Sequence, residues 1–376
     1  MEKEKLLSIV VPTKNRYKYL KYLIQLVEGF QSNLIELVVH DNSDDNSEII
    51  PFINNINFNC LKYYYSKEKL SVKDNCDQAI LHSTGEYVCM LGDDDGLLPS
   101  VISVVQYMKE NSIDYLLSLP SYYNWPDFYD PSIFNLTSAI SYTKGSGKYI
   151  RLYPIKELKK AMNNGFDGLY RMPKVYQAVV SRRFLNMVYE KCSTFSPGPS
   201  PDMANAVALS LLNGKLYQYD APLFISGQCR SFGGGERLIG AYNLKKITEV
   251  PFLPQNIEEM WSKRIPTYWC ADTIWPQSGI EAVKTMGGNL DCLSYEQILA
   301  KFVFNHPLYY KECKSLIESK YAFCKSYLSY AFNKAKAFFT HRITYFISGK
   351  TKINEYRIAR KIDTIIEAVD YLENVN

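Results

Sequence analysis

The sequence has few of the residues that build zinc sites and glycine-rich nucleotide loops. Its four histidines form no H-x-x-x-H pair or Cys/His cluster, and its nine cysteines include no C-x-x-C pair. A zinc site of the usual kind is therefore not expected, and an odd, scattered set of cysteines is typical of reduced thiols in a cytosolic protein. The segment "PTKNRYKYL" after the first predicted strand has no glycine, which argues against a Rossmann dehydrogenase and a P-loop enzyme.

Long apolar runs are also missing. No segment reaches the roughly 18 uninterrupted apolar residues of a membrane span. The first apolar run ends at Pro12, which makes it too short for the core of a signal peptide. We therefore expect a cytoplasmic protein.

The first 120 residues alternate short apolar runs with helical patterns. Apolar runs predict strands at residues 6–12, 34–40, 60–65 and 87–91, and apolar residues at helical spacing lie between them. This alternation is typical of βαβ units and predicts an α/β fold with a mainly parallel sheet flanked by helices.

Three polar segments follow predicted strands, namely Pro12–Arg16, His40–Ser47 and Gly92–Gly96. Ligand sites of open parallel sheets lie beyond the carboxyl ends of the strands, so we expect these segments to meet at one edge.

The third segment, "GDDDG", places Asp93, Asp94 and Asp95 on one tight loop. Asp-rich turns are often only solvent-exposed connections between helices and strands. Three crowded carboxylates, however, repel each other unless a cation sits among them. Mg²⁺ and Mn²⁺ prefer such oxygen ligands and bridge to diphosphates, so the loop is a candidate metal–diphosphate site.

The motifs "LSIVVPTKNR", "ELVVHDNSDDNSE" and "GEYVCMLGDDDGLLP", in this order, resemble the family 2 glycosyltransferases of GT-A fold. The resemblance covers residues 6–100 strongly and residues 170–235 more loosely. It implies an inverting, metal-dependent enzyme that moves a sugar from a nucleotide-diphosphate donor, most often UDP, to a hydroxyl of a glycan or lipid-linked oligosaccharide. It is closest to members that build bacterial surface polysaccharides such as O-antigen and capsule.

The resemblance also implies roles for particular residues. Asp41 would hydrogen-bond the nucleotide base, with Asp44 or Asp45 as alternatives. Asp93 and Asp95 would bind Mn²⁺ or Mg²⁺, and Asp93 and Asp94 would contact the donor, although the crowded triplet leaves open which carboxylates have which role. The remaining residues expected at the nucleotide are Pro12, Thr13, Asn15 and Arg16.

An inverting transferase needs a base for the acceptor hydroxyl, and Asp202 stands 107 positions after Asp95. The structural alternative is that Asp202 only favours a helix N-terminus, with Ser200 as N-cap and Pro201 in the first turn. Glu236 is the second candidate for the catalytic base. Arg230, beside the loop 231–236, would contact the diphosphate or be an ordinary surface arginine.

Residues 1–253 are predicted to form the GT-A domain, with a donor half at 1–120 and an acceptor half at 121–253. Residues 254–376 are predicted to be a helical extension. Within it, Lys320–Lys352 has no acidic residue and interleaves lysines with tyrosines and phenylalanines. Such a segment suits an anionic inner-membrane surface, or else packs its aromatic residues on the protein.

The sequence leaves other readings open. A non-catalytic GT-A protein that binds a nucleotide sugar or glycan at the membrane is the main alternative, and a nucleotidyltransferase is a distant one. The absence of a recognised binding module argues against nucleic acid as a partner.

The aromatic segment 122–129 has Trp125 at its centre. It would either stack on an acceptor sugar or pack locally, and packing is favoured. The oligomeric state is not predicted.

Overall fold

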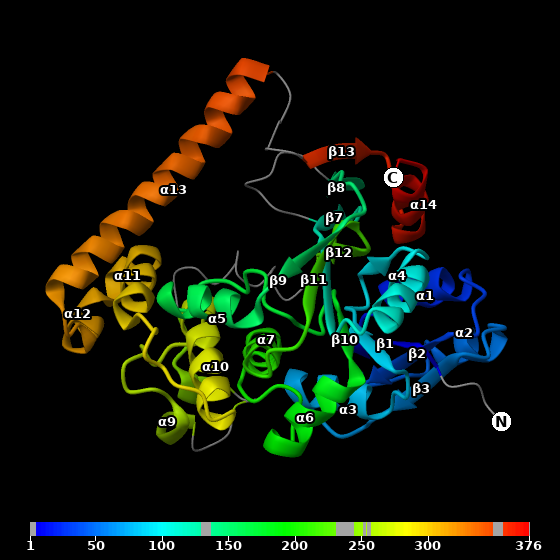
Figure 1. Cartoon of the computed structure of the whole chain (residues 1–376), viewed down its shortest axis with the longest axis horizontal. Helices are drawn as coiled ribbons and strands as arrows, with labels where there is room; N and C mark the ends of the chain where they lie inside the picture. Colours follow the sequence, from blue (N-terminus) through cyan, green and yellow to red (C-terminus); the bar gives the residue numbers. More distant parts are fainter. Residues whose placement is uncertain are drawn as a thin grey trace.

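The computed structural model describes residues 5–128, 137–230, 244–250, 253, 257–348 and 356–375, with only the backbone of 337–348 and 356. Its centre is an eight-stranded sheet of order β3-β2-β1-β4-β10-β6-β11-β9 (Figure 1). The strands are β1 (Leu7–Thr13), β2 (Ile35–Asp41), β3 (Leu61–Tyr65), β4 (Tyr87–Met90), β6 (Tyr115–Leu119), β9 (Tyr149–Leu152), β10 (Val179–Ser181) and β11 (Leu216–Pro222).

The first four strands of this sheet run parallel, and β10 enters antiparallel between β4 and β6. β1 and β2 are buried along nearly their whole length, as expected for parallel strands covered on both faces. The expected α/β architecture, a large mainly parallel sheet flanked by helices, is confirmed.

Alternate residues of the strands feed two separate cores. Ile9 and Val11 pack with the helices of one face, whereas Val10 packs with those of the other, because successive side chains of a strand point in opposite directions. The first face is covered by α1 (Tyr17–Glu28), α4 (Val101–Glu110) and α14 (Ile365–Val375), and the second by α3 (Val72–Leu81), α6 (Arg182–Cys192) and α7 (Pro201–Leu211).

A second sheet of five strands has the order β13-β8-β7-β12-β5. Its strands come from distant parts of the chain: β5 (Gly96–Leu97), β7 (Ser121–Asn124), β8 (Ala139–Thr143), β12 (Phe224–Gln228) and β13 (Tyr356–Arg360). β5 begins directly after Asp95, so this sheet connects the acidic loop to the last residues of the chain.

The region after residue 256 is mostly helical, as predicted. Its helices are α9 (Ile257–Met260), α10 (Ala271–Thr285), α11 (Tyr295–Asn305), α12 (Tyr310–Cys313) and α13 (Lys320–Ser348), with short 3-10 turns at Pro307–Tyr309 and Lys314–Leu316. Further helices are α2 (Ile50–Asn55), α5 (Pro154–Asn163) and the 3-10 turn Ile247–Glu249.

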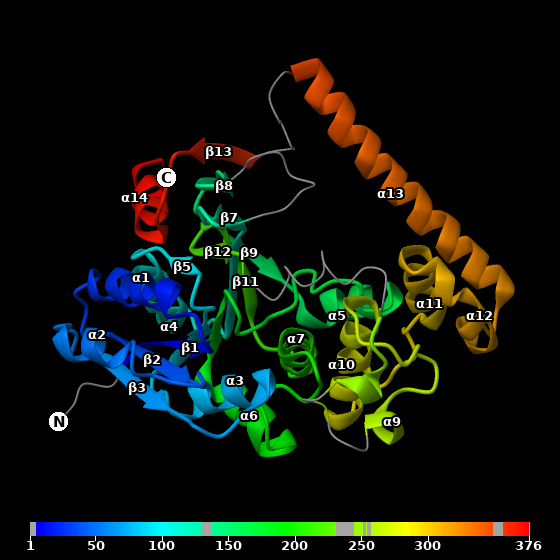
Figure 2. The same cartoon turned by 180° about the vertical axis from the view of Figure 1, so that it is seen from behind.

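The prediction that every element of this region is helical is wrong at β13. β13 pairs antiparallel with β8 of the second sheet, and α14 then packs against α1 and β5. Figure 2 shows β13 and α14 beside the N-terminal elements, at a distance from α9 to α12. The boundary proposed at residues 253 and 254 stays a prediction.

Among the helices that the structure describes, none is both long and apolar enough to cross a membrane.

Candidate active site at the ends of the parallel strands

The polar segments that follow β1, β2 and β4 meet at one edge of the sheet, as predicted. Thr13 Oγ1, at the end of β1, donates to Asp93 Oδ2 at 2.6 Å. Asn15 Nδ2 donates to Asp44 Oδ2 at 2.9 Å, and the backbone N–H of Asp44 donates back to Asn15 Oδ1 at 3.0 Å. Side chains from three strand ends therefore form one connected cluster.

Arg16 is the cation of this cluster. Its Nε lies 3.0 Å from Asp93 Oδ1, and its Nη2 lies 2.7 Å from Asp94 Oδ2. Burial raises the pKa of Asp93 to about 7 although Arg16 opposes the shift. Burial also raises the pKa of Asp94, again against the effect of Arg16. One arginine thus partly offsets the negative charge of a crowded group of carboxylates.

Asp95 has a different environment from its two neighbours. Its Oδ2 accepts the backbone N–H of Gly92 at 2.7 Å, and its Oδ1 accepts that of Gly227 in β12 at 2.8 Å. Burial and the nearby Asp94 raise the pKa of Asp95 to about 7. Both oxygens of Asp95 therefore hold the loop in shape, and its predicted metal role stays a prediction.

The donor set of the acidic loop fits a hard divalent cation. Asp93 Oδ1 and Asp94 Oδ2 are buried and pair with Arg16 at 3.0 and 2.7 Å. A carboxylate oxygen has more than one lone pair, so each of these oxygens can accept a second cation. Carboxylate oxygens at a site beside a pocket are what Mg²⁺ and Mn²⁺ take.

Asp41 is fully buried and already has protein donors. Its Oδ2 accepts the hydroxyls of Tyr17 at 2.7 Å and Tyr63 at 2.6 Å, and its Oδ1 accepts the N–H of Ser43 at 2.8 Å. This geometry anchors the start of the segment after β2. The contact with a nucleotide base that was predicted for Asp41 stays a prediction.

An open pocket of about 420 Å³ adjoins this cluster. It is lined by Asn15, Arg16, Tyr17, Lys18, Tyr19, Asp44, Asp45 and Glu48. Asn15, Arg16 and the two alternatives Asp44 and Asp45 are thus brought together, while Pro12 lies inside β1, opposite His40. The pocket therefore opens beside the residues that contact the acidic loop.

Asp202 is the second residue of α7, after Pro201, and Ser200 makes no side-chain capping bond. It is half-buried, and burial raises its pKa while the charge of Lys174 lowers it. Asp202 also interacts with Tyr176, whose hydroxyl lies beside the acidic loop, 3.5 Å from the Cβ position of Gly92. The structure therefore links Asp202, through Tyr176, to the acidic loop.

Sequence reasoning missed Lys174, Tyr176 and Cys229. Cys229 is buried, and its Sγ accepts from Arg16 Nη2 at 3.0 Å. No spacing in the sequence distinguishes these residues, because their place depends on contacts between segments about 80 to more than 200 positions apart.

Other candidate residues lie elsewhere. Arg230 is exposed at the end of the described segment 137–230, and Glu236 with the loop 231–236 lies outside the described residues.

Trp125 is buried. The centroid of its ring lies 4.9 Å from that of Tyr19 and 5.2 Å from that of Tyr123. The prediction that Trp125 packs locally is confirmed.

Two features lie away from this site. Cys270, Asp272 and His306 come together in the described part of the chain, but Asp272 already pairs with Lys301 at 3.2 Å and with His306 at 3.4 Å. This group joins α10 to α11 as an ion-pair network.

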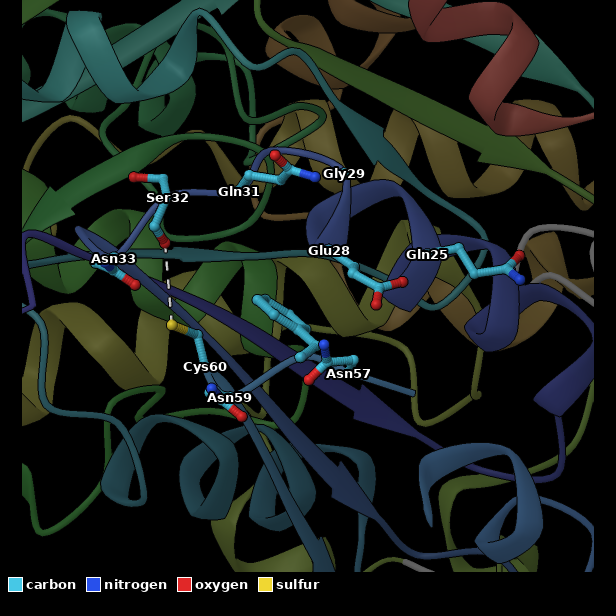
Figure 3. Close-up of a pocket in the computed structure, with 10 residues that line it drawn as sticks. Gln25, Glu28, Gly29, Gln31, Ser32, Asn33, Asn57, Asn59 and Cys60 are labelled. Carbon is cyan, nitrogen blue, oxygen red and sulfur yellow. Dashed lines mark hydrogen bonds between the residues drawn. The ribbon is translucent and has the colours of Figure 1, made fainter. Parts of the chain in front are cut away.

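A polar pocket of about 460 Å³ is lined by residues of the segments 25–33 and 57–60 (Figure 3). It lies near the amino ends of β2 and β3, whereas the acidic loop lies at the carboxyl ends of the parallel strands.

Comparison with known proteins gives one family match. Residues 8–173 match the model of the Glycosyl transferase family 2. The comparison with curated proteins gives no match.

Solved structures with similar chain traces include TarS from S. aureus, at 15% identity and a TM-score of 0.45. That alignment covers 82% of this chain and 55% of TarS. A shorter TarS fragment, residues 1–349 in complex with UDP-GlcNAc, is 16% identical with a TM-score of 0.47, and the alignment covers 86% of this chain and 89% of the fragment.

Proposed function

We propose that this chain, whose residues 8–173 match the model of the Glycosyl transferase family 2, is an inverting glycosyltransferase that uses a divalent cation and a UDP-sugar. The acceptor would be a hydroxyl of a glycan or lipid-linked oligosaccharide, in the synthesis of a surface polysaccharide such as O-antigen or capsule. UDP is the default nucleotide because it is the commonest donor nucleotide of this family.

The observation that carries the proposal is the buried acidic loop beside an open pocket. Asp93 and Asp94 are 3% and 4% exposed, and both pair with Arg16. In this proposal the same two carboxylates would also bind Mn²⁺ or Mg²⁺, whereas both oxygens of Asp95 accept backbone N–H groups. A bound cation would neutralise charge on the departing diphosphate.

The protein's own groups have separate tasks in this proposal. Asn15 and Asp44, which brace each other, border the nucleoside, and Arg16 adds positive charge beside the diphosphate. Asp202 takes the proton of the acceptor hydroxyl as the acceptor oxygen attacks the anomeric carbon. The bond to the donor phosphate breaks in the same displacement, so the anomeric centre inverts.

The first experiment is calorimetric titration of the protein with UDP, GDP, dTDP and CMP in Mn²⁺, repeated in EDTA. Metal-dependent binding of UDP alone would support the donor assignment, and a donor-sugar panel would follow. If none of the nucleotides binds, a non-catalytic scaffold is favoured. Equal nucleotide binding in EDTA would contradict the proposed use of a divalent cation.

Substitution of the proposed base separates chemistry from binding. Asp202→Asn keeps the shape of the side chain but removes its basicity, so we expect transfer to fall by about 10²-fold or more while UDP binding stays unchanged. Retention of transfer would refute the assignment.

We also propose that α13 brings the enzyme to an anionic membrane surface. Three of its apolar side chains, Tyr321, Leu328 and Phe332, are 80%, 67% and 68% exposed, and Lys325 lies between them in the sequence. The helix begins against α11, where Phe323 is buried, and then extends away from α11 and α12 (Figure 1). An enzyme with a lipid-linked acceptor would gain from such a contact.

A further inference from the structure

The guanidinium group of Arg16 is held by the acidic loop through two of its three nitrogens. Its Nε lies 3.0 Å from Asp93 Oδ1, and its Nη2 lies 2.7 Å from Asp94 Oδ2. The group also lies over the ring of Tyr19, with Cζ 5.4 Å from the ring centroid, a distance at which the aromatic face attracts a cation. These contacts restrict the rotamers that Arg16 can adopt.

Cys229 makes a further contact with the same guanidinium. Its Sγ accepts a hydrogen bond from Arg16 Nη2 at 3.0 Å, between positions 213 residues apart in the chain. Burial raises the pKa of Asp94, whereas the charge of Arg16 and a hydrogen bond with Cys229 lower it. The buried thiol therefore lies where Arg16 and Asp94 meet.

The main chain at Cys229 is fixed by the end of β12. The N–H of Gly227 donates to Asp95 Oδ1 at 2.8 Å, and the carbonyl of Gln228 accepts the N–H of Trp125 at 2.9 Å. Cys229 follows these two residues directly and is 1% exposed. Its sulfur is therefore an acceptor whose position the second sheet determines.

The third guanidinium nitrogen of Arg16, Nη1, has no hydrogen bond or ion pair among the residues that the structure describes. Arg16 also lines the open pocket of about 420 Å³, and its side chain is 21% exposed. An N–H group without a protein partner beside a pocket can donate to a ligand there. Phosphate oxygens are acceptors that match the geometry and charge of a guanidinium.

We propose that Cys229 is a positioning residue for the donor: its sulfur holds Nη2 of Arg16, so that Nη1 is directed at the diphosphate. The inference rests on the proposed function, in which Arg16 lies beside the diphosphate. No bond forms or breaks at Cys229, which acts only through the orientation of Arg16. A guanidinium that is already oriented loses less conformational freedom when the ligand binds, so the contact raises the affinity for UDP.

The test is a double-mutant cycle on UDP binding, measured by calorimetry in Mn²⁺. Cys229→Ala removes the sulfur, and we expect it to weaken UDP binding by about 3- to 10-fold, the usual range for the loss of one hydrogen bond. Arg16→Lys keeps a positive charge beside Asp93 and Asp94 but has no Nη2. If Cys229 acts through Arg16, Cys229→Ala should cause no further loss in the Arg16→Lys background.

Cys229→Ser tests rescue by a conservative change. Its hydroxyl oxygen can still accept from Arg16 Nη2, so UDP should bind within about 2-fold of the wild type. The matched control is Cys313→Ala, at an equally buried position of α12 in a separate core, which should leave UDP affinity unchanged. Thermal unfolding of each variant without nucleotide shows that it folds.

Two results overturn the inference. One is a Cys229→Ala protein that binds UDP as tightly as the wild type. The other is an equal loss of affinity from Cys229→Ala in the wild-type and Arg16→Lys backgrounds, which would mean that Cys229 only packs beside the loop.

The failure of this inference differs from the failure of the proposed function. If the wild type binds UDP in Mn²⁺ and either overturning result is found, the donor assignment stands and the role of Cys229 is wrong. If the wild type does not bind UDP, the donor assignment is wrong and the role of Cys229 is refuted with it.

Discussion

At the scale of single residues, the acidic loop is a group of charges that the fold holds close together. Arg16 contacts Asp93 and Asp94, while Asp95 accepts two backbone N–H groups. The same triplet therefore contains oxygens that shape the loop and oxygens that remain for a ligand. From the sequence alone, Asp93 and Asp95 were the predicted metal ligands, and the roles within the triplet were left open.

The raised pKa values predict a pH-dependent response to metal. Asp93 and Asp95 have pKa values of about 7 in the folded protein, above the ordinary value near 3.9 for an unfolded chain. The metal-free protein therefore loses stability as pH rises from about 4 to about 7, since the folded state binds more protons in this window. A cation that binds the ionised carboxylates offsets this loss.

We expect Mn²⁺ to raise the thermal unfolding midpoint more at pH 8 than at pH 6. At a concentration 100 times its dissociation constant, a ligand adds about 2.7 kcal/mol to the free energy of unfolding. Differential scanning fluorimetry at both pH values measures the difference, and Asp94→Asn should reduce the response at pH 8. Equal midpoint gains at the two pH values would contradict the prediction.

Gly227 of β12 packs directly against the backbone of the acidic loop. A Cβ at this position would lie 1.8 Å from the carbonyl oxygen of Asp94, which is backbone and cannot rotate away. Gly227→Ala should therefore lower the free energy of unfolding by about 2 kcal/mol or more and weaken nucleotide binding.

The matched control for Gly227→Ala is Gly168→Ala, where the nearest atom to the new Cβ is 3.9 Å away. Chemical denaturation gives the stability of both variants, and calorimetry gives their affinity for UDP. A Gly227→Ala protein that matches the control in both measurements would show that the loop adapts.

At the scale of elements, the C-terminal β13 and α14 support the acidic loop from behind. Gly96, the first residue of β5, would place a Cβ 2.7 Å from Ile365 of α14, and the hydroxyl of Tyr123 donates to the carbonyl of Ile362 at 3.0 Å. Trp125 Nε1 donates to the carbonyl of Asp94 at 3.0 Å. The end of the chain therefore packs against the strand that continues the donor site.

Ile365→Ala tests this support. Ile365 is fully buried, so its truncation should lower the free energy of unfolding by about 2 to 4 kcal/mol, and the freed loop should bind UDP more weakly. Leu299→Ala, at an equally buried position of α11, should destabilise the protein without a change in UDP affinity. Equal affinities in the two variants would mean that α14 stabilises the fold but does not shape the site.

At the scale of the whole molecule, charge and exposed apolar surface are unevenly distributed. Residues 301–376 carry 13 Lys+Arg against 7 Asp+Glu, and α13 bears exposed aromatic and aliphatic side chains. Both are properties of a surface that meets anionic lipid.

We expect the full chain to float with vesicles that contain anionic lipid and to stay at the bottom of the gradient with neutral vesicles. The double variant Leu328→Ser and Phe332→Ser should lose flotation, because it removes apolar area from the exposed face of α13. Leu308→Ser changes a side chain that is 81% exposed outside this helix and serves as control. A wild-type chain that remains unbound to anionic vesicles refutes the membrane proposal.

The sequence predicted the elements of the N-terminal half closely. Strands were expected at 6–12 and 34–40 and are found at Leu7–Thr13 and Ile35–Asp41, because apolar runs bounded by polar turns are local signals. β13 was missed for the opposite reason. Its five residues, "YRIAR", form no continuous apolar run, and they pair as a strand with the edge that β8 offers.

The sequence by itself determined the α/β class and the convergence of three polar segments, because the direction of parallel strands places their carboxyl ends together. Only the tertiary structure decided how the acidic loop is held, since this depends on Arg16, on Gly227 of a distant strand and on Trp125. It likewise decided that the last twenty or so residues lie behind the acidic loop. Such contacts join positions far apart in the chain, and no local spacing records them.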